Sequence, residues 1–213
     1  MIIAVDGPTA SGKGTIAKAL AAHFGLPHLD TGLLYRAVGV MAVRLGGDPD
    51  NPEEALAGCA FDDALLADEH LRSETAGGLA SRASRHPEVR AALLERQRDF
   101  ARQAGGAVLD GRDIGTVIAP EADAKLFVTA SVGARAGRRC AEMRSRGEDV
   151  TIDEIAADLA ARDARDSGRS VAPLKPADDA LLLDTSDLTI GQAVQRAIEL
   201  VNGRTQGGPP PKS

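Results

Sequence analysis

Aromatic side chains are almost absent from this sequence, which has no tryptophan, one tyrosine and four phenylalanines. A planar ligand would therefore be held mainly by polar contacts. Cysteine is also scarce, and Cys59 and Cys140 lack the spacing of metal ligands, so we interpret them as reduced thiols. No apolar run approaches the roughly 20 residues that span a bilayer, and the first residues do not resemble a signal peptide. We expect a soluble, cytoplasmic protein with no membrane contact.

Positive charge is also in deficit, because 25 lysines and arginines face 31 acidic residues, a formal net charge of −6. General nucleic-acid binding depends on a basic surface, so the composition argues against a nucleic-acid partner. Arginine nevertheless provides 20 of the 25 positive charges. The informative arginines are those that belong to a motif. The four histidines show no ligand spacing and receive no role.

Short apolar runs alternate with helical patterns along the chain. Buried strands are predicted at residues 1–6, 107–110, 124–128 and 180–184, and helices at 13–24, 132–146, 152–165 and 190–201. This alternation predicts an α/β fold whose parallel sheet is covered on both faces. Residues 33–103 are mostly helical in pattern and are interpreted as an insertion. The polar, proline-rich end from 203 to 213 is predicted to be a disordered tail.

The first motif is the loop Gly7-Pro8-Thr9-Ala10-Ser11-Gly12-Lys13-Gly14-Thr15, between a strand and a helix. Its backbone N–H groups and the helix N-terminus form a nest for phosphate, and its lysine reaches the outer phosphates. Its glycines permit the backbone conformations and the close approach. The common form of this motif has a hydroxyl directly after the lysine, whereas here the hydroxyl comes one residue later, at Thr15. A turn without a ligand is the alternative, and the strand–loop–helix context favours phosphate.

Two further segments carry arginine near a predicted element end. Arg36 lies one turn into a helix that begins after Asp30, where an aspartate or threonine is commonly just an N-cap. Arg112 and Asp113 follow a predicted strand at its C-terminal end, where open α/β sheets bind ligands. A surface ion pair of small energetic value is the alternative for that pair.

A third cluster of charge recurs at helical spacing. Arg162, Arg165, Asp166 and Arg169 are three or four residues apart and are predicted to share one face of a helix. A solvated, salt-bridged helix is the alternative, but guanidinium forks suit a transferring phosphate. No protein-kinase His-Arg-Asp loop is present in the sequence, which is consistent with an acceptor that is itself a phosphate.

Together these motifs resemble the bacterial cytidylate kinases. The likeness also includes Ala80-Ser81 with Arg90, Val171–Leu174 and Ala180–Thr185, and it covers nearly the whole chain up to the tail. It implies a three-layer P-loop fold in residues 1–202, with a parallel sheet core, an inserted nucleoside-monophosphate-binding domain and a helical lid. The core would comprise residues 1–32, 104–143 and 174–202, the insertion 33–103 and the lid 144–173.

The resemblance also implies a reaction, phosphoryl transfer from ATP to CMP or dCMP, and a role for each matching residue. The Gly7–Thr15 loop would hold ATP, with Thr15 as a weak ligand of Mg²⁺. Thr31, Arg36, Arg112 and Arg169 would hold the acceptor phosphate. Ser81, Arg90 and Asp113 would read the base, and Arg162 and Asp166 would meet the sugar. Lys13, Arg112, Arg162 and Arg169 would be the catalytic set.

One departure and several alternatives accompany this interpretation. The family's insertion usually carries a small β-sheet, for which residues 61–71 are too short. A small-metabolite kinase, such as a shikimate or dephospho-coenzyme A kinase, would not need Ser81, Arg90 and Asp113 to converge. A non-catalytic nucleotide switch is a second alternative, although the guanine motif of GTPases is missing. An α/β domain without a ligand ranks last, and a monomer is the simple expectation.

Overall fold

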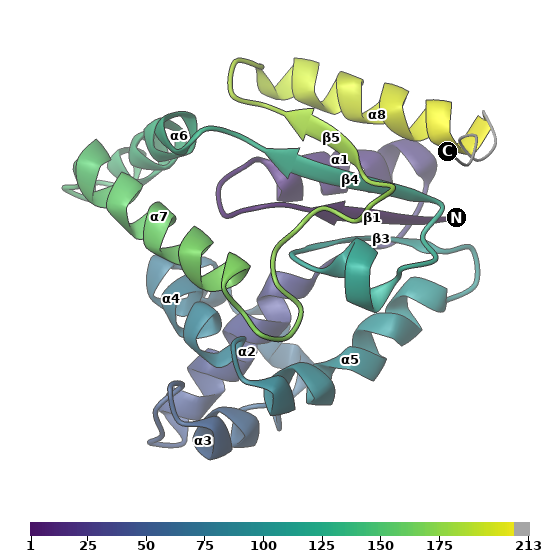
Figure 1. Ribbon diagram of the computed structural model, residues 1–213. Coiled ribbons are helices and arrows are strands. Elements are labelled where there is room, and N and C mark those ends of the chain that lie inside the picture. Colours follow the sequence, from purple (N-terminus) through teal and green to yellow (C-terminus); the bar gives the residue numbers. More distant parts are fainter. Residues whose placement is uncertain (207–213) are drawn as a thin grey trace.

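A five-stranded parallel sheet forms the centre of the computed structural model, which describes residues 1–206 (Figure 1). Its order is β2-β3-β1-β4-β5. The strands are β1 (Ile2–Asp6), β2 (His28–Asp30), β3 (Ala107–Gly111), β4 (Ala124–Thr129) and β5 (Leu181–Asp184). In the register of β1, Asp6 pairs with Gly111 on one side and Phe127 on the other. The strands therefore end together, and the loops that follow them meet at one edge.

The two faces of the sheet are covered by different helices, as the alternation of side chains along a strand requires. Ile3 and Val5 pack with α1 (Lys13–Phe24) and α8 (Ile190–Gln206). Ala4 lies on the other face with Leu109, against α5 (Pro87–Arg102) and a π-helical turn, η3 (Ile114–Ile118). This is the predicted three-layer α/β architecture.

The segment between β2 and β3 is helical throughout its ordered elements. They are α2 (Thr31–Arg44), α3 (Pro52–Ala57), the short 3₁₀ turns η1 (Asp63–Ala67) and η2 (Glu69–Arg72), α4 (Glu74–Ala83), and α5. Leu34, Val38 and Leu93 belong to a separate apolar core of this part of the molecule. The prediction that residues 33–103 are mostly helical is confirmed. Residues 63–72, which we expected to be too short for the family's small β-sheet, form 3₁₀ turns.

Two helices connect β4 to β5 in the chain. They project from the sheet beside α4 (Figure 1). They are α6 (Val132–Ser145) and α7 (Ile152–Ser167). Cys140 and Leu159 help to form an apolar seam between them, and a capping box of Thr151 and Glu154 fixes the start of α7. Both cysteines of the chain are free. Within residues 1–206, no helix has both the length and the apolar character needed to cross a membrane.

The structure corrects the sequence-based prediction in three places. Strand β2 was not predicted, because its three residues His28–Asp30 are only partly buried at the sheet edge and carry little apolar signal. Helix α8 continues to Gln206, so residues 203–206 are helical and not part of a tail; the rest of that predicted tail lies outside the described residues. Arg169 lies beyond α7, which ends at Ser167, so it does not share a helix face with Arg162. Gly203 within α8 destabilises the helix by only about 1 kcal/mol relative to alanine, which the burial of Val201 can offset.

Candidate active site

A cavity of about 680 Å³ opens at the carboxyl ends of the strands. It is lined by the phosphate-loop helix, the start of α2, the loop after β3 and the two projecting helices. The predicted site residues on its wall are Thr9, Ala10, Ser11, Gly12, Lys13, Gly14, Thr15, Thr31, Arg36, Ser81, Arg90, Arg112, Asp113, Arg162, Asp166 and Arg169. Of the predicted residues, Gly7 and Pro8 do not line it. Five segments that are distant in sequence therefore share one concave surface.

The loop after β1 has the backbone that an anion nest requires. Gly12 adopts a left-handed conformation (φ 89°) and caps the N-terminus of α1, so the first N–H groups of that helix face the cavity end of the loop. Ala10 is also left-handed (φ 61°), a conformation that costs a non-glycine residue about 1–2 kcal/mol. This local strain lies in the loop itself, where a fixed backbone shape serves binding.

Gly7 has a positive φ (154°), as expected of a glycine that permits the backbone conformation of the loop, and packing imposes a second requirement on it. A Cβ atom at this position would lie 2.0 Å from the carbonyl oxygen of Val128 in β4. Glycine is therefore required by packing of the loop on the neighbouring strand. Gly7 shapes the loop from beneath and does not itself line the cavity.

Lys13 is the first residue of α1 and lies among charges of both signs. Desolvation in the cavity, with repulsion from Arg112, lowers the pKa of Lys13 to about 8, while Asp110 and Asp30 act in the opposite direction. Burial, together with the charge of Asp110, raises the pKa of Asp30. A bound phosphate would supply the anion that this ammonium group lacks.

Arg112 joins three parts of the site. Its Nε donates to Asp166 Oδ2 at 2.8 Å, and its Nη2 donates to Thr9 Oγ1 at 2.6 Å. Thr9 belongs to the phosphate loop and Asp166 to α7, so this guanidinium lies between the loop after β1, the loop after β3 and the projecting helices. Its side chain is 22% exposed, which leaves it accessible from the cavity.

Asp166 is held by two arginines. Besides Arg112, it accepts from Arg169 Nη2 at 2.5 Å, and the same Nη2 donates to Ser84 Oγ at 2.9 Å. Burial acts to raise the pKa of Asp166, but the charges of Arg112 and Arg169 and the hydrogen bond from Arg112 outweigh it and hold the pKa below its ordinary value. The carboxylate is thus kept ionised within a predominantly cationic cluster.

The three residues expected to read a base come from three elements. Arg90 of α5 pairs with Asp113, both being at least nine-tenths buried, and its guanidinium lies 5.4 Å from the ring centre of Tyr35. Ser81 of α4 lines the same cavity, and its Oγ accepts from Arg165 Nε at 3.2 Å. Polar groups with fixed partners therefore stand on one wall of the cavity.

Arg162 and Arg36 lie close together near the N-terminus of α4. Arg162 Nη2 pairs with Glu74 Oε2 at 2.9 Å, and Arg139 of α6 pairs with the same carboxylate. Arg36 Nη1 donates to the carbonyls of Leu71 and Ser73 at 2.7 and 2.8 Å. These contacts tie α7 and α6 to α4, and α2 to the residues that directly precede α4.

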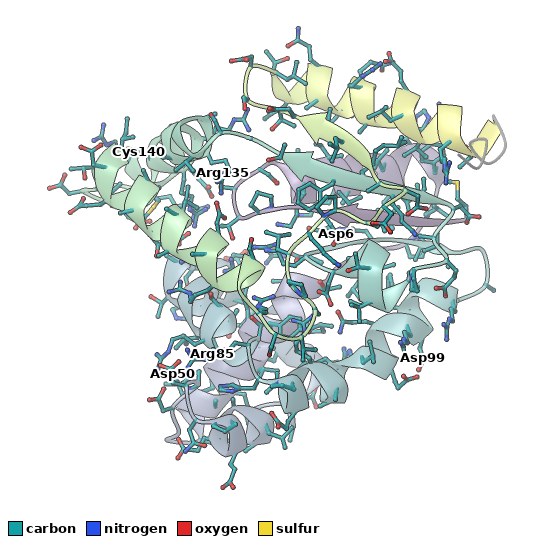
Figure 2. All side chains as sticks on the ribbon, viewed as in Figure 1. Asp6, Asp50, Arg85, Asp99, Arg135 and Cys140 are labelled. Carbon is teal, nitrogen blue, oxygen red and sulfur yellow. The ribbon has the colours of Figure 1, made fainter. Side chains whose placement is uncertain are left out.

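Several contacts at the site carried no signal that the sequence analysis used. His28 Nε2 lies 2.8 Å from Asp110 Oδ1, although no role was given to this histidine. Glu74 lies in a stretch without a recognisable motif. Arg138 donates to Thr185 and lines the cavity, whereas Arg135 is buried against Asp163 and the Thr9 carbonyl (Figure 2). Because residues three apart share a helix face, the spacing of Arg135 and Arg138 on α6 could not have separated their roles.

Comparison with known proteins shows close relatives over almost the full length. A family model described as "Cytidylate kinase" matches residues 3–203. A cytidylate kinase of Xanthobacter autotrophicus is 56% identical over 97% of this chain and 100% of its own length. One from Rhodospirillum rubrum is 54% identical over 97% and 99%, and one from Cereibacter sphaeroides is 57% identical over 97% of both.

A solved structure is similar in fold. An uncharacterized protein from Eubacterium ventriosum aligns with a TM-score of 0.55 at 16% identity, over 95% of this chain and 98% of that chain. At this identity the likeness concerns the fold alone.

Proposed function

The chain belongs to the cytidylate kinase family, and we propose that it transfers the γ-phosphoryl group of Mg-ATP to CMP or dCMP. The observation that carries the proposal is the convergence of three arginine-bearing segments and the Gly7–Thr15 loop on one cavity. A ligand-free domain would have no reason to gather them. The donor and the acceptor would lie on opposite sides of the space between Lys13 and Arg112.

On the donor side, the N–H groups at the start of α1 and the Lys13 ammonium would hold the ATP phosphates. Thr15 lines the cavity and offers a hydroxyl oxygen, and the carboxylates of Asp30 and Asp110 lie on the same wall. Oxygen donors of this kind suit Mg²⁺, which keeps several waters and binds mainly through the nucleotide phosphates. Among residues 1–206 no three acidic, histidine or cysteine side chains form a metal site by themselves, so the ion would arrive with ATP. When bound, it neutralises phosphate charge.

On the acceptor side, Thr31, Arg36, Arg112 and Arg169 would surround the CMP phosphate, and Arg162 and Asp166 would meet the sugar. Thr31 Oγ1 donates to the Asp110 carbonyl at 2.9 Å, which fixes its position at the floor of the cavity. Ser81, Arg90 and Asp113 would form hydrogen bonds with the cytosine edge. The ionised Asp166 accepts hydrogen bonds from two arginines. Its proposed contact with the sugar would be compatible with both CMP and dCMP.

Transfer would proceed by in-line displacement. An oxygen of the CMP phosphate attacks the γ-phosphorus, and the bond from that phosphorus to the oxygen of ADP breaks, giving CDP and ADP. The attacking oxygen is already largely ionised near neutral pH, so positioning and charge screening replace a general base. Lys13, Arg112, Arg162 and Arg169 would provide that screening. We also propose that residues 33–103 and 144–173 close over the substrates, which would exclude water as a competing acceptor.

The proposal is tested by measuring ADP release from Mg-ATP with CMP, dCMP, UMP, AMP or shikimate supplied separately at equal concentration. We expect fast turnover with CMP and dCMP and little with the other acceptors. Turnover with shikimate would favour a small-metabolite kinase, and turnover with UMP or AMP would remove the base-reading role of the trio. Tight ATP binding without transfer to any acceptor would favour a nucleotide switch.

Ser81→Ala should weaken the preference for CMP over UMP by roughly fivefold, because a hydrogen bond to the base contributes about 1 kcal/mol. The effect should appear in the ratio of kcat/KM for the two acceptors, while kcat with saturating CMP stays near the wild-type value. Ser145→Ala is the matched control, since Ser145 is exposed at the end of α6 and away from the cavity wall. An unchanged ratio in Ser81→Ala would contradict base reading by this side chain.

A further inference from the structure

Asp6 is a buried carboxylate that no step of the transfer uses. It is the last residue of β1, immediately before the phosphate loop, and it is only 5% exposed. Figure 2 labels it at the sheet, beside the turn that follows β3. Buried carboxylates are rare unless they are paired or hydrogen-bonded, so its partners define what it does.

Both oxygens of Asp6 accept hydrogen bonds from consecutive backbone groups of η3. Oδ1 accepts from the Ile114 N–H and Oδ2 from the Gly115 N–H, each at 2.8 Å. These are the first donors of the turn, whose own hydrogen bonds begin only with Val117 N to the Asp113 carbonyl. Asp6 therefore caps η3 from a strand more than 100 residues away in sequence.

Close packing keeps this arrangement in one position. A Cβ atom at position 115 would lie 3.1 Å from Lys125 Cδ and 3.4 Å from Asp6 Oδ2, so glycine lets the backbone approach the carboxylate. On the other side, Asp6 pairs in register with Gly111, the residue before Arg112. Arg112 and Asp113 are thus fixed at both ends, by the sheet before them and by the Asp6 carboxylate after them.

We propose that Asp6 is a positioning residue of the acceptor site, which holds Arg112 and Asp113 in place relative to the phosphate loop. The inference rests on the proposed function, because these two residues are the ones proposed to contact CMP. Asp6 directly precedes Gly7 of the phosphate loop. Asp6 therefore connects the loop proposed to bind the donor with the loop proposed to bind the acceptor.

The electrostatic setting shows that this carboxylate is costly to keep. Burial raises the pKa of Asp6 to about 7, and the charge of Asp113 adds to the rise, against the hydrogen bonds from Gly115 and Ile114 and the charge of Arg112. An apolar residue would avoid that desolvation cost but would leave two backbone N–H groups without acceptors.

Hydrogen–deuterium exchange of Asp6→Asn and Asp6→Ala tests the contact directly. The Ile114 and Gly115 amides should exchange at least roughly tenfold faster in Asp6→Ala than in the wild type, while amides within β3 keep their protection. Asp6→Asn keeps one acceptor oxygen and should give an intermediate rate. Equal protection of both amides in all three proteins would overturn the proposal, whatever the acceptor substrate proves to be.

Kinetics of the same variants test the consequence. KM for CMP should rise by roughly tenfold in Asp6→Asn and further in Asp6→Ala, whereas the Kd for ATP without acceptor should change less than twofold. Asp123→Asn is the matched control. Like Asp6, Asp123 accepts a backbone hydrogen bond, in this case from the Ile2 N–H at 2.7 Å, but it is exposed and lies at the opposite end of β1.

The outcomes separate the two hypotheses. A variant with faster exchange at Ile114 and Gly115 but wild-type KM for CMP would refute positioning, while a wild-type protein that does not phosphorylate CMP would refute the proposed function. A parallel rise in KM for CMP and Kd for ATP would indicate general damage and also refute the assignment. Melting temperatures of all variants identify any loss of folding.

Discussion

Lys13→Ala is expected to lower turnover of CMP by roughly 10³-fold or more, because it removes the ammonium group proposed to screen the transferring phosphate. Lys13 is the first residue of helix α1, and its side chain lies among Arg112, Asp110 and Asp30. Without it, the excess negative charge of the two carboxylates would oppose phosphate binding instead of balancing a cation. Both kcat and the affinity for ATP should fall.

The measurement is steady-state ADP release, with ATP affinity determined separately by titration calorimetry. Lys18→Ala is the matched control, since Lys18 lies on the same helix with an exposed side chain. Its kinetics should equal those of the wild type. Near-normal turnover in Lys13→Ala would refute the mechanism, and loss of ATP binding with normal kcat at saturation would limit Lys13 to binding.

Most of the fold could be predicted from periodicity and from the position of the loop. The three central strands, β3, β1 and β4, are apolar runs that are largely buried, so their signal is strong, as for Ile2–Asp6 and Ala124–Thr129. Strand β2 was not predicted, because an edge strand of three half-buried residues does not form an apolar run. The end of α8 was not predicted because Gly203 was interpreted as the start of a tail, although a single glycine costs a helix only about 1 kcal/mol.

The residues of the candidate site that belong to a contiguous sequence motif were predictable. Arg112–Asp113 and the Gly7–Thr15 loop follow strands, and strand ends meet at one edge of a parallel sheet. Contacts made by isolated side chains were not predictable. His28 beside Asp110 and Glu74 between Arg139 and Arg162 depend on tertiary packing, and neither residue stands in a recognisable spacing.

Gly7 shows that a motif glycine can be required by packing as well as by its backbone conformation. Its place in the loop suggested close approach to phosphate, yet the atom that excludes a side chain there is the Val128 carbonyl oxygen of β4. A sequence pattern records that glycine is required but does not record which neighbour requires it. Only the packing of the loop on the sheet supplies that answer.

Arg112→Ala should have the second largest effect, a fall in kcat of roughly 10³-fold, comparable to the loss of other arginines that screen a transferring phosphoryl group. The reason is its position, since it donates both to Thr9 in the phosphate loop and to Asp166 beside the proposed sugar site. Removing it would leave the space between donor and acceptor without this cation. The fold should persist, because Asp166 keeps Arg169 as a partner.

Arg112→Lys separates charge from geometry. Lysine keeps the positive charge but cannot reach Thr9 and Asp166 from one planar fork, so we expect it to recover only part of the rate and to remain at least roughly tenfold below the wild type. Arg102→Ala is the control, because Arg102 pairs with Glu121 on the exposed surface and should not alter kinetics. Full activity of Arg112→Lys would show that a point charge is sufficient there. Full activity of Arg112→Ala would show that screening at the transfer site rests on Lys13 and the remaining arginines.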